Sequence, residues 1–242
     1  MNRVFKKSVK NLFYFFGLKI NFVSKGELTE AQKIAWLRKL DVKTIIDVGA
    51  SKGNVSLNLH KIFPTAKIYA FEPLLDCCEI IKKKLAGIAN VRIFNLAISD
   101  HRGHSKIFRS AYSGASSMIP MASLHKDLFP VTAGQSVQDV QVDTLDNCFE
   151  KLEYDSPVLI KIDVQGLEDK VIKGGQVTFS RAKILLVETS FSRLYEGQPL
   201  FNDICRQLED LGFRYAGVWG NGDFRSPIDG SPLQQDSIFI KD

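Results

Sequence analysis

Short β-branched runs alternate with amphipathic segments along most of the chain, and this alternation is the feature that most constrains its fold. The expected strands are residues 44–48, 66–71, 90–98, 157–162 and 183–187, and the expected helices are residues 55–63, 74–85, 167–173 and 200–211. Strict alternation is typical of a parallel sheet with helices on both faces. Such a sheet binds its ligand at the carboxyl ends of the strands.

Two stretches depart from this alternation. Residues 101–142 hold a strand-like run near each end and a Ser-, Gly- and Pro-rich segment over 110–135. A connection of that length inside a compact domain is most often functional, so we expect an inserted hairpin that acts as a lid. Near the C-terminus, residues 213–218 and 236–240 flank a turn-rich segment and predict an antiparallel hairpin at the sheet edge.

Length and composition favour one large α/β domain. The chain has 242 residues, of which 45% are hydrophobic and 24% charged, so a disordered or coiled-coil chain is not expected. The net charge of +5 is too small for a dedicated nucleic-acid-binding protein, and no nucleic-acid partner is expected. The four cysteines form no C-x-x-C pair, and the chain carries neither a bilayer-spanning run nor a signal-peptide pattern. These features predict a cytoplasmic protein.

The first 27 residues form a basic, aromatic arm, and a single domain is expected over residues 28–242. Lysines, arginines and aromatic rings are interleaved in this arm. Such a segment can lie in the headgroup region of an anionic membrane, which predicts peripheral contact with the inner membrane face through residues 1–25. Alternatively, the arm packs on the domain itself or on a partner subunit, and composition leaves both open. Residues 28–40 have helical spacing, and the oligomeric state is not predicted.

A glycine-containing loop follows the first expected strand. The sequence Asp47-Val-Gly49-Ala50-Ser-Lys-Gly53 ends that strand and opens the next helix. Small residues let a ligand approach the backbone, and Asp47 is suited to a ligand ammonium group. The loop lacks the G-x-G-x-x-G pattern of a dinucleotide site and also lacks the Walker pattern. A purely structural turn is the alternative reading.

Glu72 directly follows the second expected strand. A carboxylate there can accept hydrogen bonds from both hydroxyls of a ribose. Alternatively, Glu72 and Pro73 only start the next helix. Taken with the glycine loop and Asp47, the pattern favours a ligand that has an amino-acid end and a ribose but no phosphate, which describes S-adenosylmethionine.

Six ordered motifs then resemble the FkbM-type family of S-adenosylmethionine-dependent methyltransferases. They are TIIDVGASKGNVS, YAFEP, NLAISDHRG, VDTLD, KIDVQGLEDKVIKGG and VETS, and the resemblance covers residues 44–240. It implies a Rossmann-like class I methyltransferase fold, with a mostly parallel seven-stranded sheet whose C-terminal strand is antiparallel. It also implies O-methylation of a sugar, glycan, glycolipid or natural-product hydroxyl, as in polysaccharide biosynthesis.

The resemblance also assigns cofactor contacts. It implies that Asp47, Gly49 and Gly53 line the methionine end of the cofactor and that Glu72 binds the ribose. Ala50, Pro73 and Asp163 are further candidates for cofactor contact. The stretch Ala97-Ile98-Ser99 would lie at the adenine.

Asp163 closes the fourth expected strand and therefore lies at the ligand-binding edge of the sheet. It can act as the base for the acceptor hydroxyl, orient the substrate, hold a divalent cation with Glu168 and Glu188, or only cap the structure. The family more often has D-V-E-G at this turn. Gln165 therefore removes a carboxylate, and no metal is predicted. Glu188 is a candidate for substrate contact, and Glu168 is equally suited to a helix start.

The remaining candidates are weaker. Among the loop histidines, His101 and His104 are expected at the surface, and His125 becomes a candidate catalytic base if the insertion folds over the site. Ser116 and Ser117 resemble a small-residue stretch of the family that contacts the cofactor or the lid. Lys161 points the same way as Asp163, although a lysine at the sheet edge is the plain reading.

Three other functions remain open at this point. An NAD(P)-dependent oxidoreductase is disfavoured by the glycine loop, and a catalytically silent methyltransferase-like module is disfavoured by the three strand-end carboxylates. A nucleic-acid methyltransferase would carry an Asn/Asp-Pro-Pro-Tyr-like motif where this chain has Asp163-Val-Gln165-Gly. A hydroxyl acceptor therefore fits best.

Overall fold

The described part of the chain is residues 35–241 of a computed structural model. The chain divides into two units, Met1–Lys39 and Leu40–Asp242. The described residues of the first unit contain one short helix, α3 (Ala35–Arg38). The predicted arm over 1–27, with its membrane contact through 1–25, lies outside the described residues, as does most of the helix expected over 28–40.

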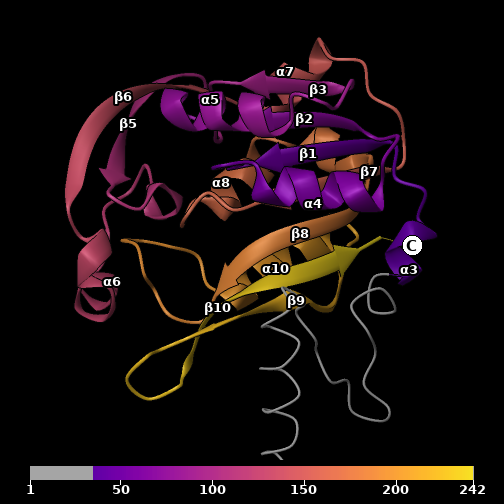
Figure 1. The fold of residues 1–242 in the computed structure, drawn as a ribbon. Coiled ribbons are helices and arrows are strands. Elements are labelled where there is room, and N and C mark those ends of the chain that lie inside the picture. The colour runs from indigo at the N-terminus through magenta and orange to yellow at the C-terminus, as the bar shows by residue number, and fades with distance from the viewer. Residues whose placement is uncertain (1–34, 242) are drawn as a thin grey trace, which may run out of the picture. The chain divides into compact units, whose positions relative to one another are not determined.

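A seven-stranded sheet forms the centre of the second unit, in the order β3-β2-β1-β7-β8-β10-β9 (Figure 1). The strands are β1 (Thr44–Val48), β2 (Lys67–Phe71), β3 (Val91–Phe94), β7 (Val158–Ile162), β8 (Ala182–Ser190), β9 (Arg214–Arg225) and β10 (Pro232–Ile240). Neighbouring strands from β3 to β8 are parallel, whereas β10 is antiparallel to both β8 and β9. The predicted sheet with an antiparallel C-terminal strand is confirmed.

Helices cover both faces of this sheet. They are α4 (Asn54–Ile62), α5 (Leu75–Lys84), α7 (Leu145–Glu150), α8 (Glu168–Lys173), α9 (Gln176–Ser180) and α10 (Phe201–Asp210). Side chains alternate between the faces along β1, so Ile46 and Val48 join the core formed with α7 to α10, and Asp47 points toward α4. Within residues 35–241, no helix combines the length and apolar character needed to cross a bilayer.

The third expected strand, residues 90–98, is wrong as a single element. It breaks after Phe94, and β4 (Ala97–Ile98) joins a second sheet with β6 (Gln135–Asp143) and β5 (Gly103–Ser110), in the order β4-β6-β5. The break arises because Asn95 Nδ2 donates to the carbonyls of Glu72 and Pro73, and the Leu96 N–H also donates to Glu72 O. The chain is thereby bound to the loop after β2 and leaves the large sheet.

The insertion between β5 and β6 contains η1 (Ser113–Ala115), α6 (Ser123–Leu128) and η2 (Pro130–Thr132). It lies on the side of the large sheet toward which the arrowheads of β1 and β8 point (Figure 1). Its backbone is bonded to the segment after β8, since the Ala122 N–H donates to Leu194 O and the Glu196 N–H donates to Pro120 O. The predicted inserted hairpin is therefore present, and its connecting segment is attached to the domain.

The C-terminal hairpin is longer than expected. β9 continues to Arg225, well beyond residue 218, and pairs with β10 through several register shifts. The turn shrinks to residues 226–231, where the Ser226 N–H donates to Ser231 O. The glycines of β9 are tolerated because β9 is an edge strand with register shifts, and Pro232 is tolerated as the first residue of β10.

Candidate active site

A cavity of about 320 Å³ lies at the carboxyl ends of β1, β2, β7 and β8. The glycine loop, the end of β2, the turn after β7, Glu188 and the inserted segment all contribute to its wall. Its lining residues are Gly49, Ala50, Ser51, Lys52, Asn54, Val55, Phe71, Glu72, Pro73, Leu96, Ala97, Ile98, Ile107, Tyr112, Ser113, Gly114, Ser116, Ser117, Met118, Lys161, Asp163, Val164, Gln165 and Glu188. Its size and mixed lining fit a small-molecule site.

The glycine loop lies directly against the turn after β7. Gly49 has φ +75°, and a Cβ there would lie 1.8 Å from the backbone oxygen of Asp163. Only glycine fits this close approach in the left-handed conformation. Ser51 also has a positive φ, 49°, and its N–H donates to Glu72 Oε2 at 2.7 Å. The loop therefore holds the Glu72 carboxylate in place.

Glu72 has the lone pairs that a ribose contact requires. Its second oxygen, Oε1, accepts from the Leu74 N–H at 2.9 Å, so each carboxylate oxygen retains one free lone pair. Burial raises the pKa of Glu72 to about 7, although the two backbone hydrogen bonds partly oppose this shift. Two further donors, such as the adjacent hydroxyls of a ribose, would satisfy a carboxylate held in this way.

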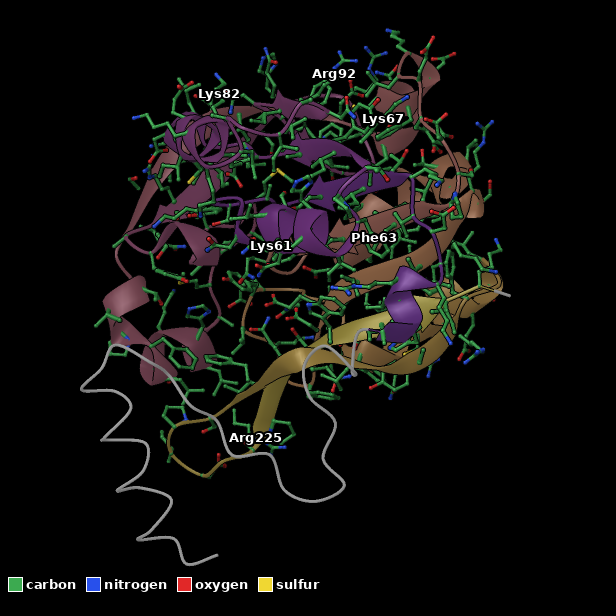
Figure 2. All side chains as sticks on the ribbon, turned by 45° about the vertical axis from the view of Figure 1, so that its right-hand side comes forward. Lys61, Phe63, Lys67, Lys82, Arg92 and Arg225 are labelled. Carbon is green, nitrogen blue, oxygen red and sulfur yellow. The ribbon has the colours of Figure 1, made fainter. Side chains whose placement is uncertain are left out.

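A buried lysine lies beneath the loop. The Lys161 ammonium donates to Gly49 O at 2.7 Å and lies 3.4 Å from both Asp47 Oδ1 and Asp163 Oδ2. Lys161 is only 6% exposed, whereas Lys61 and Lys82 point outward from α4 and α5 (Figure 2). Burial alone would lower the pKa of Lys161, but nearby carboxylates, chiefly Asp163 and Asp47, outweigh burial and raise it. The site therefore contains a permanent internal cation.

Gln165 connects the two carboxylates at the other end of the cavity. Its Nε2 donates to Asp163 Oδ1 at 2.6 Å and to Glu188 Oε2 at 2.7 Å. Its Oε1 accepts from the hydroxyl of buried Tyr195 at 2.7 Å, which fixes the orientation of the amide. Gln234 also donates to Glu188 Oε2, at 2.9 Å. Asp163, from the end of β7, and Glu188, from β8, are thus held side by side.

Two carboxylates near this end have raised pKa values. Burial raises the pKa of Glu168 to about 7, although its Oε1 accepts from the N–H groups of Val164 and Gly166. Burial, together with the nearby Asp163, raises the pKa of Glu188 well above its ordinary value. Perturbed carboxylates of this kind are concentrated at functional sites.

The inserted segment forms a further part of the cavity wall. Ser117 Oγ donates to the backbone oxygen of Gln165 at 2.6 Å, and the Tyr195 hydroxyl lies 3.1 Å from Ala115 O. Ser116 and Ser117 therefore lie at the cavity wall, as does Tyr112, whose ring is 6.0 Å from the Lys52 ammonium.

Not every predicted residue reaches the cavity. Of the cofactor candidates, Gly49, Ala50, Glu72, Pro73 and Ala97 line it, as do the catalytic candidates Asp163 and Glu188. The residues outside the lining are Asp47, Gly53, Ser99 and His125.

Each of these four has another environment. Asp47 is fully buried, accepts from Ser56 Oγ at 2.5 Å and lies 3.4 Å from the Lys161 ammonium. Gly53 faces the Ile81 side chain, and the Ser99 N–H donates to Asp143 O. His125 is buried against Thr132 and the Tyr195 ring, and burial lowers its pKa. A role for His125 as the base is therefore not proposed.

Sequence reasoning gave no definite role to three contributors. Lys161 was noted as pointing the same way as Asp163, with an edge lysine as the plain reading, and the structure buries it near Asp47 and Asp163. Gln165 was interpreted only as the loss of a carboxylate, but its side-chain amide bridges Asp163 and Glu188. Tyr195 follows β8 without any local motif, so no sequence signal pointed to it. In the described residues, no group of three or more His, Cys, Asp and Glu side chains is arranged to hold a metal ion.

The strand order, the reversed last strand and the glycine loop facing a strand-end carboxylate define a class I methyltransferase. The chain matches the Methyltransferase FkbM domain over residues 47–215, and it belongs to this family of S-adenosylmethionine-dependent methyltransferases. The NAD(P)-dependent alternative is thereby set aside.

Two curated relatives are methyltransferases. The 2-O-methyltransferase NoeI of Sinorhizobium fredii is 28% identical over 173 residues, covering 69% of this chain and 71% of the relative. Methyltransferase sdnD of Sordaria araneosa is 26% identical over 193 residues, covering 70% and 73%. Among solved structures, a putative methyltransferase from Streptococcus mutans in complex with SAH aligns with a TM-score of 0.47 and 12% identity, covering 88% of this chain and 99% of that chain.

Proposed function

We propose that this methyltransferase acts on a hydroxyl group of a sugar, glycan, glycolipid or natural-product acceptor. The observation that carries the proposal is the pair of cavity-lining carboxylates, Asp163 and Glu188, held side by side by one amide. A carboxylate accepts hydrogen bonds and protons, which a hydroxyl can supply. The name of NoeI, a 2-O-methyltransferase, agrees with this choice of acceptor.

The cofactor end of the cavity fits S-adenosylmethionine. Glu72 would accept the two ribose hydroxyls, and Pro73, Ala97 and Ile98 offer an apolar surface for the adenine. Gly49, Ala50 and Ser51 of the glycine loop also line the cavity. When bound, this cofactor supplies an electrophilic methyl group on a sulfonium.

Asp163 is the residue that we assign to the acceptor hydroxyl. A hydroxyl oxygen has to be held in line with the methyl group, about 3–3.5 Å away, and has to lose its proton during or after attack. Asp163 Oδ2 lies 3.4 Å from the Lys161 ammonium, and this ion pair helps hold the carboxylate in place. Asp163 would orient the hydroxyl and take its proton, while Gln165 prevents the carboxylate from turning away.

Nitrogen acceptors of nucleic acids fit the turn after β7 less well than hydroxyl acceptors do. The turn after β7 reads Asp163-Val164-Gln165-Gly166, without an Asn/Asp-Pro-Pro-Tyr-like motif. Asp163, Gln165 and Glu188 are all intact and ordered by hydrogen bonds, which also argues against a silent module. Peripheral membrane contact through residues 1–25 stays a prediction from composition.

The test is a methyl-transfer screen with S-adenosylmethionine that carries an isotope label in its methyl group. Purified full-length protein is incubated with glycans, glycosides, phenolic natural products, amines and RNA, and labelled products are identified by mass spectrometry. We expect label on a hydroxyl oxygen of the polyhydroxylated or phenolic compounds. Label confined to nitrogen or to nucleic acid would refute the proposal.

A further inference from the structure

The paired carboxylates leave two oxygen atoms for a ligand. Gln165 Nε2 uses one oxygen of each group, Asp163 Oδ1 and Glu188 Oε2, and Gln234 also donates to the latter. Asp163 Oδ2 has Lys161 at 3.4 Å, and Glu188 Oε1 has no hydrogen bond to the described residues. Both side chains line the cavity. The cavity therefore presents two hydrogen-bond acceptors from neighbouring strands.

The spacing of the two carboxylates is fixed by contacts around Gln165. Both hydrogens of its amide are committed to carboxylates, and its Oε1 accepts from Tyr195. Its backbone oxygen accepts from Ser117 Oγ at 2.6 Å, and its φ of 57° is an uncommon conformation for a non-glycine residue. A residue in the left-handed backbone conformation that is fixed by four hydrogen bonds is typical of a preorganised functional turn.

A ligand that matches two adjacent acceptors has to bring two adjacent donors. A cation is one solution, but the Lys161 ammonium already lies 3.4 Å from Asp163 Oδ2 and gives this carboxylate a positive partner. The sulfonium of the bound cofactor would bring a further positive charge to the cavity. Neutral donors are therefore favoured, and two neighbouring hydroxyl groups supply them.

We infer that Asp163, Gln165 and Glu188 form a seat for a vicinal diol of the acceptor. Asp163 takes the reacting hydroxyl, Glu188 takes the neighbouring hydroxyl, and Gln165 is a positioning residue that sets the distance between them. The inference rests on the proposed function and deepens it, since it selects acceptors with two adjacent hydroxyls over acceptors with one. Gln165 would therefore act on acceptor choice, and cofactor binding would not depend on it.

The experiment measures binding of acceptor probes to the full-length protein saturated with S-adenosylhomocysteine. The probes are methyl glycosides with a free vicinal diol and the matching deoxy glycosides, and binding is followed by saturation-transfer NMR. We expect the wild type to bind the best diol probe about tenfold more tightly than its deoxy partner, because one hydrogen bond is lost in the latter.

Two variants test the assignment within the seat. Glu188→Gln should reduce the diol preference to within about twofold, because it weakens the acceptor for the second hydroxyl. Gln165→Glu keeps the side-chain length and the acceptor for Tyr195 but places a carboxylate against two others, so the preference should fall as well. Glu150→Gln, on the exposed end of α7, is the matched control and should leave the preference unchanged. Binding of S-adenosylhomocysteine should stay within about threefold in all three variants.

Three results would overturn the diol seat. They are equal binding of diol and deoxy probes, an unchanged preference in Glu188→Gln, and no binding of any glycoside by the loaded wild type. The proposed function is judged separately by the methyl-transfer screen. Transfer to isolated hydroxyls without a diol preference would refute the diol seat but agree with O-methylation. Transfer to nitrogen would refute both the diol seat and O-methylation.

Discussion

The two ends of the cavity are built in different ways. The cofactor end comes from consecutive β–α units, in which the loop after β1 and the carboxylate after β2 meet through one hydrogen bond between Ser51 and Glu72. The acceptor end joins segments far apart in the chain, because Gln165 contacts Glu188, Tyr195 and Ser117. Local motifs therefore encode the first end, and long-range packing encodes the second.

This difference leads us to expect distinct failures from substitutions at the two ends. Changes at the acceptor end should abolish turnover and spare cofactor affinity. Changes at the cofactor end should weaken cofactor affinity or the fold of the loop. A variant that lowers turnover and cofactor affinity to the same extent would contradict this separation of the two ends.

The largest effect is expected for Asp163→Asn. The variant keeps the shape of the side chain but removes the group that takes the proton, so kcat should fall about 10²- to 10⁴-fold. Cofactor affinity, measured by titration calorimetry, should stay within a few fold. Asp169→Asn on α8 is a matched control that lies outside the cavity lining and should keep turnover near that of the wild type. Turnover within tenfold of wild type in Asp163→Asn would exclude the assigned role.

The next effect is expected for Gly49→Ala, at the contact between the two ends. A Cβ would lie 1.8 Å from Asp163 O, and the positive φ adds a backbone penalty. The free energy of unfolding should fall by about 3 kcal/mol or more, measured by urea denaturation. Gly197→Ala is the matched control, because Gly197 has φ +71° with no atom within 4 Å of the added Cβ. It should cost about 1 kcal/mol, and an equal loss in both variants would show that the contact with Asp163 is unimportant.

Glu72→Gln should weaken binding of S-adenosylhomocysteine about tenfold or more, because one acceptor for the ribose is lost. Glu79→Gln on α5 changes an exposed charge and serves as the control. The pKa of Glu72 is raised to about 7, so its carboxylate becomes protonated as the pH falls below that value. Wild-type affinity should therefore decrease from about pH 8 to about pH 6, and the affinity of Glu72→Gln should stay flat. A wild-type affinity independent of pH would argue against a direct ribose contact.

The same contrast explains what could be predicted from the sequence. The strands β1 and β7 and the positions of Glu72 and Asp163 follow from alternation and from motifs at strand ends, and the antiparallel C-terminal strand follows from the family resemblance. The bridge formed by Gln165 could not be predicted, because it depends on Tyr195 and Ser117, which no periodicity brings together. The break after β3 was missed for a related reason, since Asn95 bonds to the loop after β2.

Asp47 gives a further example of this limit. A carboxylate at the end of a strand was assigned to a ligand ammonium, and the structure pairs it with the ammonium of Lys161. Both readings satisfy the same chemistry. The ion pair arises because Lys161 lies opposite Asp47 on the neighbouring strand, and strand register is not visible in one sequence.

The smallest effect is expected for Glu168→Gln, which probes the electrostatic cost of the acceptor end. Glu168 is 2% exposed, and burial raises its pKa to about 7 in the folded protein from an ordinary value of 4.5. Its contribution to stability is therefore complete below about pH 4.5 and is lost as the pH rises through about 7.

Glutamine resembles the protonated carboxyl group and still accepts hydrogen bonds from the N–H groups of Val164 and Gly166. The variant should be about 1 to 2 kcal/mol more stable than wild type at about pH 8 and nearly equal to it at about pH 5, by urea denaturation. Glu150→Gln should change stability by less than about 0.5 kcal/mol at either pH. A gain of the same size at both pH values would mean that packing, and not ionisation, accounts for the difference.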